Sequence, residues 1–144
     1  MKVKIKKLCE NAVLPTYGSL GAAGADLYAC LDKDLSIGKG ETVLVRTGVQ
    51  MAIPEGYVGL VYARSGLASK RGLAPANKVG VIDSDYRGEI LVALYNQSGE
   101  TQIIKDGERI AQIVIAPYLK AEFEETDRLS DTDRGEGGFG STGM

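Results

Sequence analysis

The sequence predicts an all-β domain, and three observations support that prediction. Apolar residues alternate with lysines from Val3 and Ile5 onward, which is the period of a strand with one buried face. Short apolar runs separated by glycine and proline continue as far as Tyr118, and only one short stretch has a helical pattern. The 144 residues, 44% of them hydrophobic, suffice for a single domain with its own core.

The expected strands, turns and helix can be placed in order along the chain. Strands are expected near residues 2–7, 25–31, 41–53, 57–63, 79–83, 88–96, 101–104 and 108–119. Tight turns are expected at 38–40 and 105–107, which contain the glycine and aspartate that favour chain reversal. Residues 65–71 form the expected helix, with Ser65 as its N-cap and Gly72 as its end.

Two of the expected strands are apolar on both faces. The runs GEILVALYN (88–96) and RIAQIVIAP (109–117) carry apolar side chains at odd and even positions alike. Strands of this kind are covered on both sides. A small sandwich or barrel could cover both faces internally, but for a compact subunit whose outer faces are also covered we expect further copies of the chain to do so.

Charge and composition restrict the partners and the location. The sequence has 17 Lys and Arg against 19 Asp and Glu, so it lacks the basic surface that nucleic acid selects, and no nucleic-acid partner is expected. No stretch has the length of a membrane span and no apolar signal core is present, so a cytoplasmic protein without a membrane partner is expected. Cys9 and Cys30 are expected to be reduced thiols, because two cysteines are too few for a disulfide framework.

Histidine is absent from the sequence, which removes the commonest general base and the commonest metal ligand. Any acid–base chemistry must therefore use a carboxylate. A zinc site is not expected, whereas a hard cation such as Mg²⁺, held largely by phosphates and water, is compatible with the composition.

The C-terminal tail, residues 126–144, changes in composition to charge and glycine. Its segment RGEGGFGSTG (134–143) holds one cation, one aromatic ring, two hydroxyls and five glycines. Such a segment is either a disordered end or is ordered by a ligand, since glycine loses the most backbone freedom on folding. A nucleotide would suit its anion-pairing, ring-stacking and phosphate-wrapping groups. These groups are Arg134, Phe139, Gly140, Ser141 and Thr142.

The segment GVIDSDYRG (80–88) offers two carboxylates and a tyrosine between glycines. Asp83 and Asp85 would point to opposite sides of an extended strand, so only one of them can face a common pocket unless the chain bends. The segment is either an ordinary hairpin tip or a site in which one aspartate is a general base and Tyr86 supports a sugar or base.

Three further positions are candidates for phosphate or metal chemistry. In ARSGLA (63–68), Arg64, Ser65 and Gly66 lie where the helix begins, which is either a plain helix start or an anion site. Gln112 interrupts an apolar strand and needs a partner, which is either a neighbouring backbone group or a phosphate oxygen. Asp26, isolated among small and apolar residues, either caps a turn or orients a magnesium-bound water.

Five segments together, in this order, resemble the motifs of the trimeric deoxyuridine triphosphatases (dUTPases). They are AGADLYA (23–29), ARSGLA (63–68), GVIDSDYRG (80–88), GERIAQIVI (107–115) and RGEGGFGSTG (134–143). The resemblance implies a jelly-roll-like β-sandwich or barrel over residues 1–125. It also implies a homotrimer in which a mobile arm, residues 126–144, closes over the active site of a neighbouring subunit.

The reaction implied by the resemblance converts dUTP and water into dUMP and pyrophosphate, with Mg²⁺ as cofactor. In this family the reaction supplies dUMP for thymidylate synthesis and keeps uracil out of DNA. Asp83 would activate the water that attacks the α-phosphorus, and Asp26 would contact the water shell of the metal. The base and sugar would be bound by Asn77, Gly80, Val81, Tyr86 and Phe139. The phosphates would be bound by Arg64, Ser65, Gly66, Gln112, Arg134, Gly140, Ser141 and Thr142.

Two other functions are weighed against this one. The dCTP deaminases share the fold, but they carry a serine where this chain has Gly66 and a catalytic glutamate where it has Ala93. The missing carboxylate makes deamination the weaker hypothesis. A binding or regulatory protein on the same fold is the second alternative, and the presence of Asp83 argues against a loss of chemistry.

Overall fold

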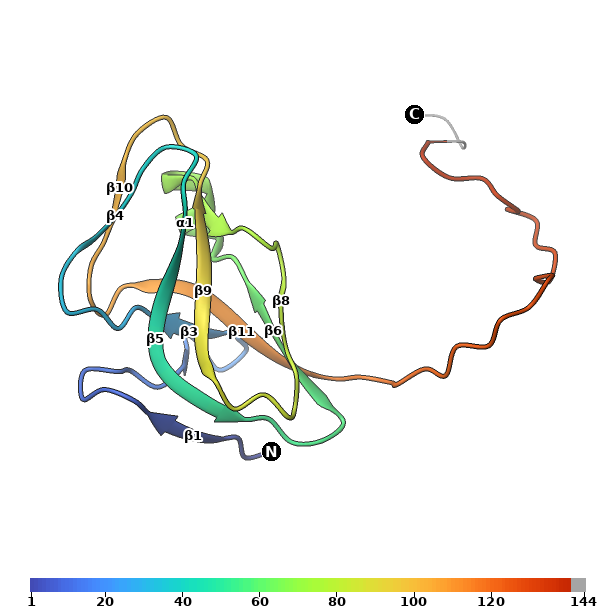
Figure 1. The fold of residues 1–144 in the computed structure, drawn as a ribbon, viewed down its shortest axis with the longest axis horizontal. Helices are drawn as coiled ribbons and strands as arrows, with labels where there is room; N and C mark the ends of the chain where they lie inside the picture. The colour runs from blue at the N-terminus through green and yellow to red at the C-terminus, as the bar shows by residue number, and fades with distance from the viewer. Residues whose placement is uncertain (141–144) are drawn as a thin grey trace.

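The computed structural model describes residues 1–140, and its strands form two large sheets around one core and a third, small sheet (Figure 1). All neighbouring strands are antiparallel. The four-stranded sheet has the order β1 (Lys4–Lys7), β5 (Thr42–Ala52), β9 (Glu89–Asn96), β7 (Leu73–Pro75). The five-stranded sheet has the order β2 (Thr16–Tyr17), β3 (Ala25–Tyr28), β11 (Arg109–Pro117), β6 (Tyr57–Tyr62), β8 (Gly80–Ile82). The third sheet pairs β10 (Gln102–Ile104) with β4 (Leu35–Ile37). The all-β prediction is confirmed.

Alternating side chains of the long strands fill the core. In β9, Ile90, Val92 and Leu94 are buried and point toward the facing sheet, as period two requires. Leu91, between them, points outward and is 41% exposed, and Leu44 of the neighbouring β5 is 62% exposed. One chain therefore covers only one face of this sheet, although the sequence is apolar on both.

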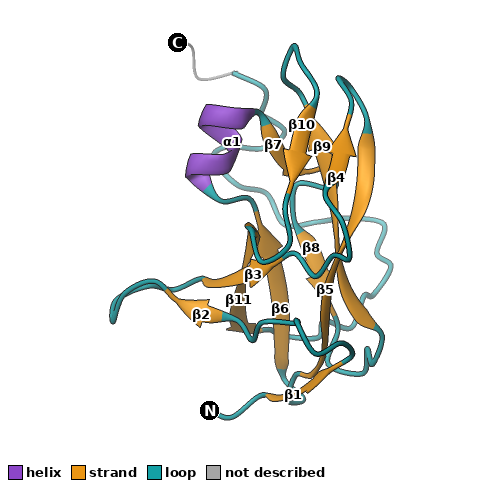
Figure 2. Ribbon diagram, turned by 90° about the vertical axis from the view of Figure 1, so that its left-hand side faces the viewer, coloured by secondary structure: helices purple, strands orange, loops and turns teal. Residues whose placement is uncertain are grey.

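The helix α1 (Ser65–Arg71) has the predicted bounds and follows β6 directly. Its predicted N-cap is wrong: Arg64, with φ −88° and ψ 129°, is the N-cap residue, and no side chain caps the helix. Gly72 ends the helix as predicted, because it adopts a left-handed φ of 64° and its N–H donates a hydrogen bond to the carbonyl of Ala68. Arg71 ties the helix to β10 through a hydrogen bond of 3.0 Å to Gln102, and Figure 2 shows α1 near β7 and β10.

The structure corrects the prediction that Cys9 and Cys30 are separate reduced thiols. It pairs them as a disulfide across 21 residues of sequence, with Cα atoms 7.7 Å apart. The Leu8 N–H donates a hydrogen bond of 2.8 Å to the Gly48 carbonyl, which folds the segment after β1 back onto β5. A Cβ atom on Gly48 would lie 2.5 Å from the Cys9 sulfur, so glycine makes room for the pair.

The predicted turn at 105–107 is confirmed, and it holds two loops together. The carboxylate of Asp106 accepts hydrogen bonds from the Leu31 N–H (2.9 Å) and the Asn11 amide (3.1 Å). These hydrogen bonds, that of Leu31 first, hold the pKa of Asp106 below its ordinary value. The same turn leads into β11, which carries Gln112.

The chain after β11 runs away from the sheets, as the orange to red part of Figure 1 shows. Within the described residues, the hydrogen bonds of Arg134 stay inside the tail: its Nε donates to the Gly137 carbonyl at 2.7 Å. Phe139 is fully exposed, with a left-handed φ of 50°. No helix in residues 1–140 has the length and apolar character needed to cross a membrane.

Candidate active site

Asp26 joins two arginines at one end of the five-stranded sheet. Its Oδ1 accepts a hydrogen bond of 2.7 Å from Arg64 Nε, and its Oδ2 lies 3.4 Å from a terminal guanidinium nitrogen of Arg109. The Asp26 side chain is only 13% exposed. Since it lies within β3, it does not cap a turn, and that alternative is wrong. Arg109 was missed by sequence analysis because only the pairing of β3 with β11 brings it to Asp26.

Gln112 lies beside this charged group. In β11 it stands opposite Asp26 on one side and Tyr62 on the other. Its Nε2 donates a hydrogen bond of 2.8 Å to the Ala63 carbonyl, so the predicted backbone partner is confirmed. The amide therefore connects β11 to the residue just before Arg64.

Gly24 gives the Gln112 side chain its space. A Cβ atom at position 24 would overlap Gln112 Oε1 and lie 3.0 Å from its Cδ. Contacts this short require the amide to move. A glycine at this position is therefore needed for the observed position of Gln112.

Under the activity that the resemblance implies, replacing Gly24 with alanine is expected to displace the Gln112 amide and to raise the KM for dUTP roughly tenfold, equivalent to ~1.4 kcal/mol. Steady-state kinetics measures the change. Gly21→Ala is the matched control, because a Cβ atom there meets nothing within 4 Å. Equal KM values for the two variants would show that the position of Gln112 does not matter.

Ser65 and Gly66 complete this end of the sheet. They are the first residues of α1, and both are exposed next to the half-buried Arg64. The structure thus brings together one group of the predicted phosphate and metal residues. We call these residues, together with Arg109, which was not predicted, the arginine cluster: Asp26, Arg64, Ser65, Gly66, Arg109 and Gln112.

The second group of predicted residues lies around β8. The chain bends after Ile82, and the Tyr86 N–H donates a hydrogen bond of 3.1 Å to the Asp83 carbonyl. Because of this bend Asp83 and Asp85 line the same cavity, of about 410 Å³, together with Lys120. The opposite orientation expected for an extended strand therefore does not apply. Lys120 was not found by sequence analysis, because nothing near it in the sequence marks it.

Asp83 also borders a second, smaller cavity. This cavity of about 170 Å³ is lined by Tyr86, Val81 and Leu91 as well as Asp83. The Tyr86 hydroxyl donates a hydrogen bond of 2.9 Å to the Glu89 carbonyl, and the ring remains 42% exposed. Asp83 thus lines both this smaller cavity, with Tyr86, and the larger cavity that also contains Asp85 and Lys120.

Asn77 and Gly80 lie together at the other end of β8. A Cβ atom on Gly80 would be 3.5 Å from Asn77 Nδ2 and 3.2 Å from the Val61 side chain. Lys78, between them in sequence, has a left-handed φ of 65°, which is uncommon for a residue with a side chain. The turn it forms places the amide of Asn77 beside Gly80, and Val81 follows as an exposed residue.

The two groups of residues are separated along β6. Ile82 pairs with Gly59, so Asp83, the next residue, lies beside Val58 of β6. Asp83 and Val58 both line the larger cavity. Gln112 pairs with Tyr62, four positions further along β6. At about 3.3 Å per residue these positions are roughly 13 Å apart. One chain therefore does not bring Asp83 to the arginine cluster.

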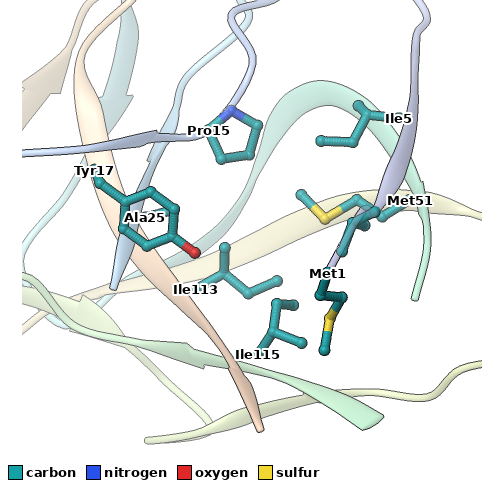
Figure 3. Close-up of a pocket in the computed structure, with 9 residues that line it drawn as sticks. Met1, Ile5, Pro15, Tyr17, Ala25, Met51, Ile113 and Ile115 are labelled. Carbon is teal, nitrogen blue, oxygen red and sulfur yellow. The ribbon is translucent and has the colours of Figure 1, made fainter. Parts of the chain in front are cut away.

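A third cavity lies under β1 and differs in chemistry (Figure 3). It has a volume of about 210 Å³ and is lined by apolar side chains and one tyrosine. The lining residues are Met1, Val3, Ile5, Pro15, Tyr17, Ala25, Met51, Ile113 and Ile115. None of its side chains is charged or carries an amide, so it lacks the side-chain groups that bind a triphosphate, and the candidate site remains at β8 and the arginine cluster.

The family model named dUTPase matches residues 10–143, which include all five segments singled out above. The chain belongs to the dUTPase family. The match begins before the first segment and ends with the last, so it covers the tail as well as the sheets.

Curated relatives of this dUTPase match along their full length. The deoxyuridine 5'-triphosphate nucleotidohydrolase of Desulfitobacterium hafniense (strain DSM 10664 / DCB-2) is 54% identical over 147 residues, covering 100% of this chain and 97% of the relative. The protein of the same name from Hydrogenobaculum sp. (strain Y04AAS1) is 53% identical and covers 100% and 99%.

Solved structures of dUTPases have the same fold. A variant of the Staphylococcus phage 80α dUTPase superposes with a TM-score of 0.89 at 29% identity, covering 97% of this chain and 98% of the other. Another variant of that phage enzyme, solved with dUpNHpp, gives a TM-score of 0.86 at 30% identity and covers 99% of both chains. These neighbours have the jelly-roll fold, so the predicted jelly-roll-like sandwich is confirmed, with sheets that do not close into a barrel.

Proposed function

We propose that Asp83 is the general base in the reaction of this dUTPase, which hydrolyses dUTP, and that the products are dUMP and pyrophosphate. The observation that carries the proposal is that Asp83 lines both the smaller cavity, with Tyr86, and the larger cavity, with Asp85 and Lys120. A nucleoside in the smaller cavity would direct its phosphates toward the Asp83 carboxylate. Asp83 would take a proton from water as the water oxygen bonds to the α-phosphorus, and the bond to the β-phosphate oxygen would break to release pyrophosphate.

The proposed base and sugar contacts account for the choice of nucleotide. The Asn77 amide and the backbone at Gly80 and Val81 would read the polar edge of uracil, and cytosine would present the wrong donor pattern to them. A slot lined by backbone excludes the thymine methyl by steric overlap, which discriminates more strongly than an apolar pocket would. Tyr86 would lie against the deoxyribose and leave no space for a 2′-hydroxyl.

The arginine cluster would bind the triphosphate. The carboxylate of Asp26 fixes the guanidinium of Arg64 at 2.7 Å and lies 3.4 Å from that of Arg109, so both cations are held at one place. Ser65, Gly66 and Gln112 would add polar contacts to phosphate oxygens. Positioned charges of this kind hold the reacting groups in line and offset the charge that develops in the transition state.

Mg²⁺ is the proposed cofactor, and the donor set of the chain fits a cation that arrives with the nucleotide. Within residues 1–140 no three His, Cys, Asp or Glu side chains gather to hold a metal ion. Mg²⁺ commonly keeps several waters and is bound through substrate phosphates. Asp26, beside the arginine cluster, would contact its water shell. The ion would supply charge neutralisation on the phosphates.

We further propose a homotrimer with shared active sites. Asp83 and the arginine cluster are roughly 13 Å apart along β6 within one chain, and in a shared site the Asp83 of one subunit would meet the arginine cluster of another. Exposed apolar side chains support an interface: Leu44 and Leu91 on the outer sheet face, and Leu119 and Phe123 after β11.

The proposed division of the chain follows from this assembly. Residues 1–125 form the β domain, and the arm, residues 126–144, would close over the site of a neighbour. There Arg134 would reach the γ-phosphate, Phe139 would stack on uracil, and Gly140 would wrap phosphate oxygens. Ser141 and Thr142, the other proposed phosphate contacts, lie outside the described residues.

Pyrophosphate release tests the proposed function. With Mg²⁺ present, the purified protein is expected to release pyrophosphate from dUTP and to act far more slowly on dTTP, dCTP and UTP. Release of ammonia from dCTP would instead identify a deaminase. Tight dUTP binding without any product would favour the binding protein.

A further inference from the structure

A bulge in β5 lies next to the loop that carries Asp83 and Tyr86 and is joined to it by hydrogen bonds. The register of β5 against β9 shifts between Arg46 and Gln50, so that Gln50 lies opposite Glu89. Gly48, inside this bulge, has a φ of 69°, which glycine adopts without strain. Bulges bend a strand and re-aim its side chains. This bulge belongs to none of the five segments that carry the family resemblance.

Gln50 reaches the loop through its side chain. Its Nε2 donates a hydrogen bond of 2.7 Å to the Arg87 carbonyl. The Arg87 guanidinium in turn donates to the carbonyls of Ser84 (2.7 Å) and Tyr86 (2.9 Å). The loop is therefore closed by its own hydrogen bonds and is joined to β5 through Gln50.

The Tyr86 ring is held in one position by contacts with Gly88 and Glu89. It lies over Gly88, where a Cβ atom would be 2.5 Å from the Tyr86 Cζ. The Tyr86 hydroxyl donates to the Glu89 carbonyl at 2.9 Å. The Glu89 carboxylate accepts hydrogen bonds from the N–H of Gly48, in the bulge (2.8 Å), and from Nε of Arg46, the last paired residue before it (3.2 Å). The backbone at Glu89, which binds the Tyr86 hydroxyl, is thus attached to β5 at a second point besides Gln50.

We propose that Gln50 is a positioning residue for sugar selection. By fixing the Arg87 carbonyl, its amide keeps the backbone on both sides of Arg87 in place, so that the Tyr86 ring stays on Gly88. The inference rests on the proposed function, because it requires that Tyr86 contact the deoxyribose. Gln50 itself touches neither the sugar nor the phosphates and acts through Tyr86.

Two variants of Gln50 distinguish the effect of losing the hydrogen bond from the effect of changing the shape of the side chain. Gln50→Met keeps the length but removes the donor. Gln50→Glu keeps the shape and places a carboxylate against the Arg87 carbonyl. The ratio of kcat/KM for dUTP to that for UTP is expected to fall roughly three- to tenfold in Gln50→Met, the effect of one lost hydrogen bond, and further in Gln50→Glu. The melting temperatures of both should stay close to that of the wild type.

Gln97→Met is the matched control, because Gln97 is exposed and its side chain makes no hydrogen bond within residues 1–140. It should keep the wild-type selectivity. Unchanged selectivity in both Gln50 variants would overturn the inference, as would a loss that follows the melting temperature. If the wild type and Gln97→Met fail to hydrolyse dUTP, the proposed function is wrong, and the inference fails with it.

Discussion

Replacing Asp83 with asparagine is expected to lower kcat by a factor on the order of 10² to 10⁴ and to leave the affinity for the nucleotide nearly unchanged. Asparagine has the shape of aspartate, so the cavities that Asp83 borders keep their walls. An amide does not accept the proton of the attacking water, so the chemical step loses its base. Single-turnover kinetics with dUTP, together with binding of the unreactive analogue dUpNHpp, measures the two quantities separately.

Asp85→Asn is the matched control for this experiment. Asp85 is exposed and lines the same larger cavity, so the substitution makes the same change of charge two residues away. Its effect on kcat should be within a few-fold. Near-normal turnover by Asp83→Asn, or equal losses in both variants, would remove Asp83 from the role of base.

Deleting residues 133–144 is expected to lower kcat/KM for dUTP by a factor on the order of 10² to 10³ while leaving the assembly intact. The deletion removes Arg134 and Phe139, and stacking on a base is worth roughly 1 to 3 kcal/mol. A charge-assisted contact to phosphate adds a comparable amount. The sheets are untouched, because the hydrogen bonds of Arg134 stay within the tail. Steady-state kinetics and light scattering measure activity and subunit number.

Leu129→Ala in the full-length chain is the control for the deletion, because Leu129 is an exposed tail residue without a proposed ligand contact. It should behave as the wild type. A truncated protein with normal kcat/KM would show that the arm takes no part in the reaction. A truncated protein that is active but monomeric would contradict the shared sites.

The long strands were predictable from the sequence, because their alternation extends over many residues. Residues 41–53 and 88–96 were expected as strands, and they contain β5 and β9. The strands β2, β4 and β7 have only two or three residues each, too few to show a period, and were not predicted, whereas the equally short β8 and β10 lie within the expected strands 79–83 and 101–104. The N-cap at Ser65 was wrong because Arg64 takes the extended backbone that the capping position requires.

The candidate site was predictable one residue at a time, but its arrangement was not. The need of Gln112 for a hydrogen-bond partner followed from an amide in an apolar strand, and of the two expected partners the structure shows the backbone one, at Ala63. The contact of Asp26 with Arg109, and the fit of Gly24 to Gln112, arise only from strand pairing. Local sequence patterns contain no information on which residues distant strands place side by side. The pairing of Cys9 with Cys30 was missed for the same reason.

Hydrolysis of dUTP in ¹⁸O-labelled water shows which phosphorus atom the Asp83-activated water attacks. Mass spectrometry of the separated products locates the label. Attack on the α-phosphorus beside Asp83 predicts label in dUMP and none in pyrophosphate. Label in pyrophosphate would place the attack on the β-phosphorus and would contradict the mechanism.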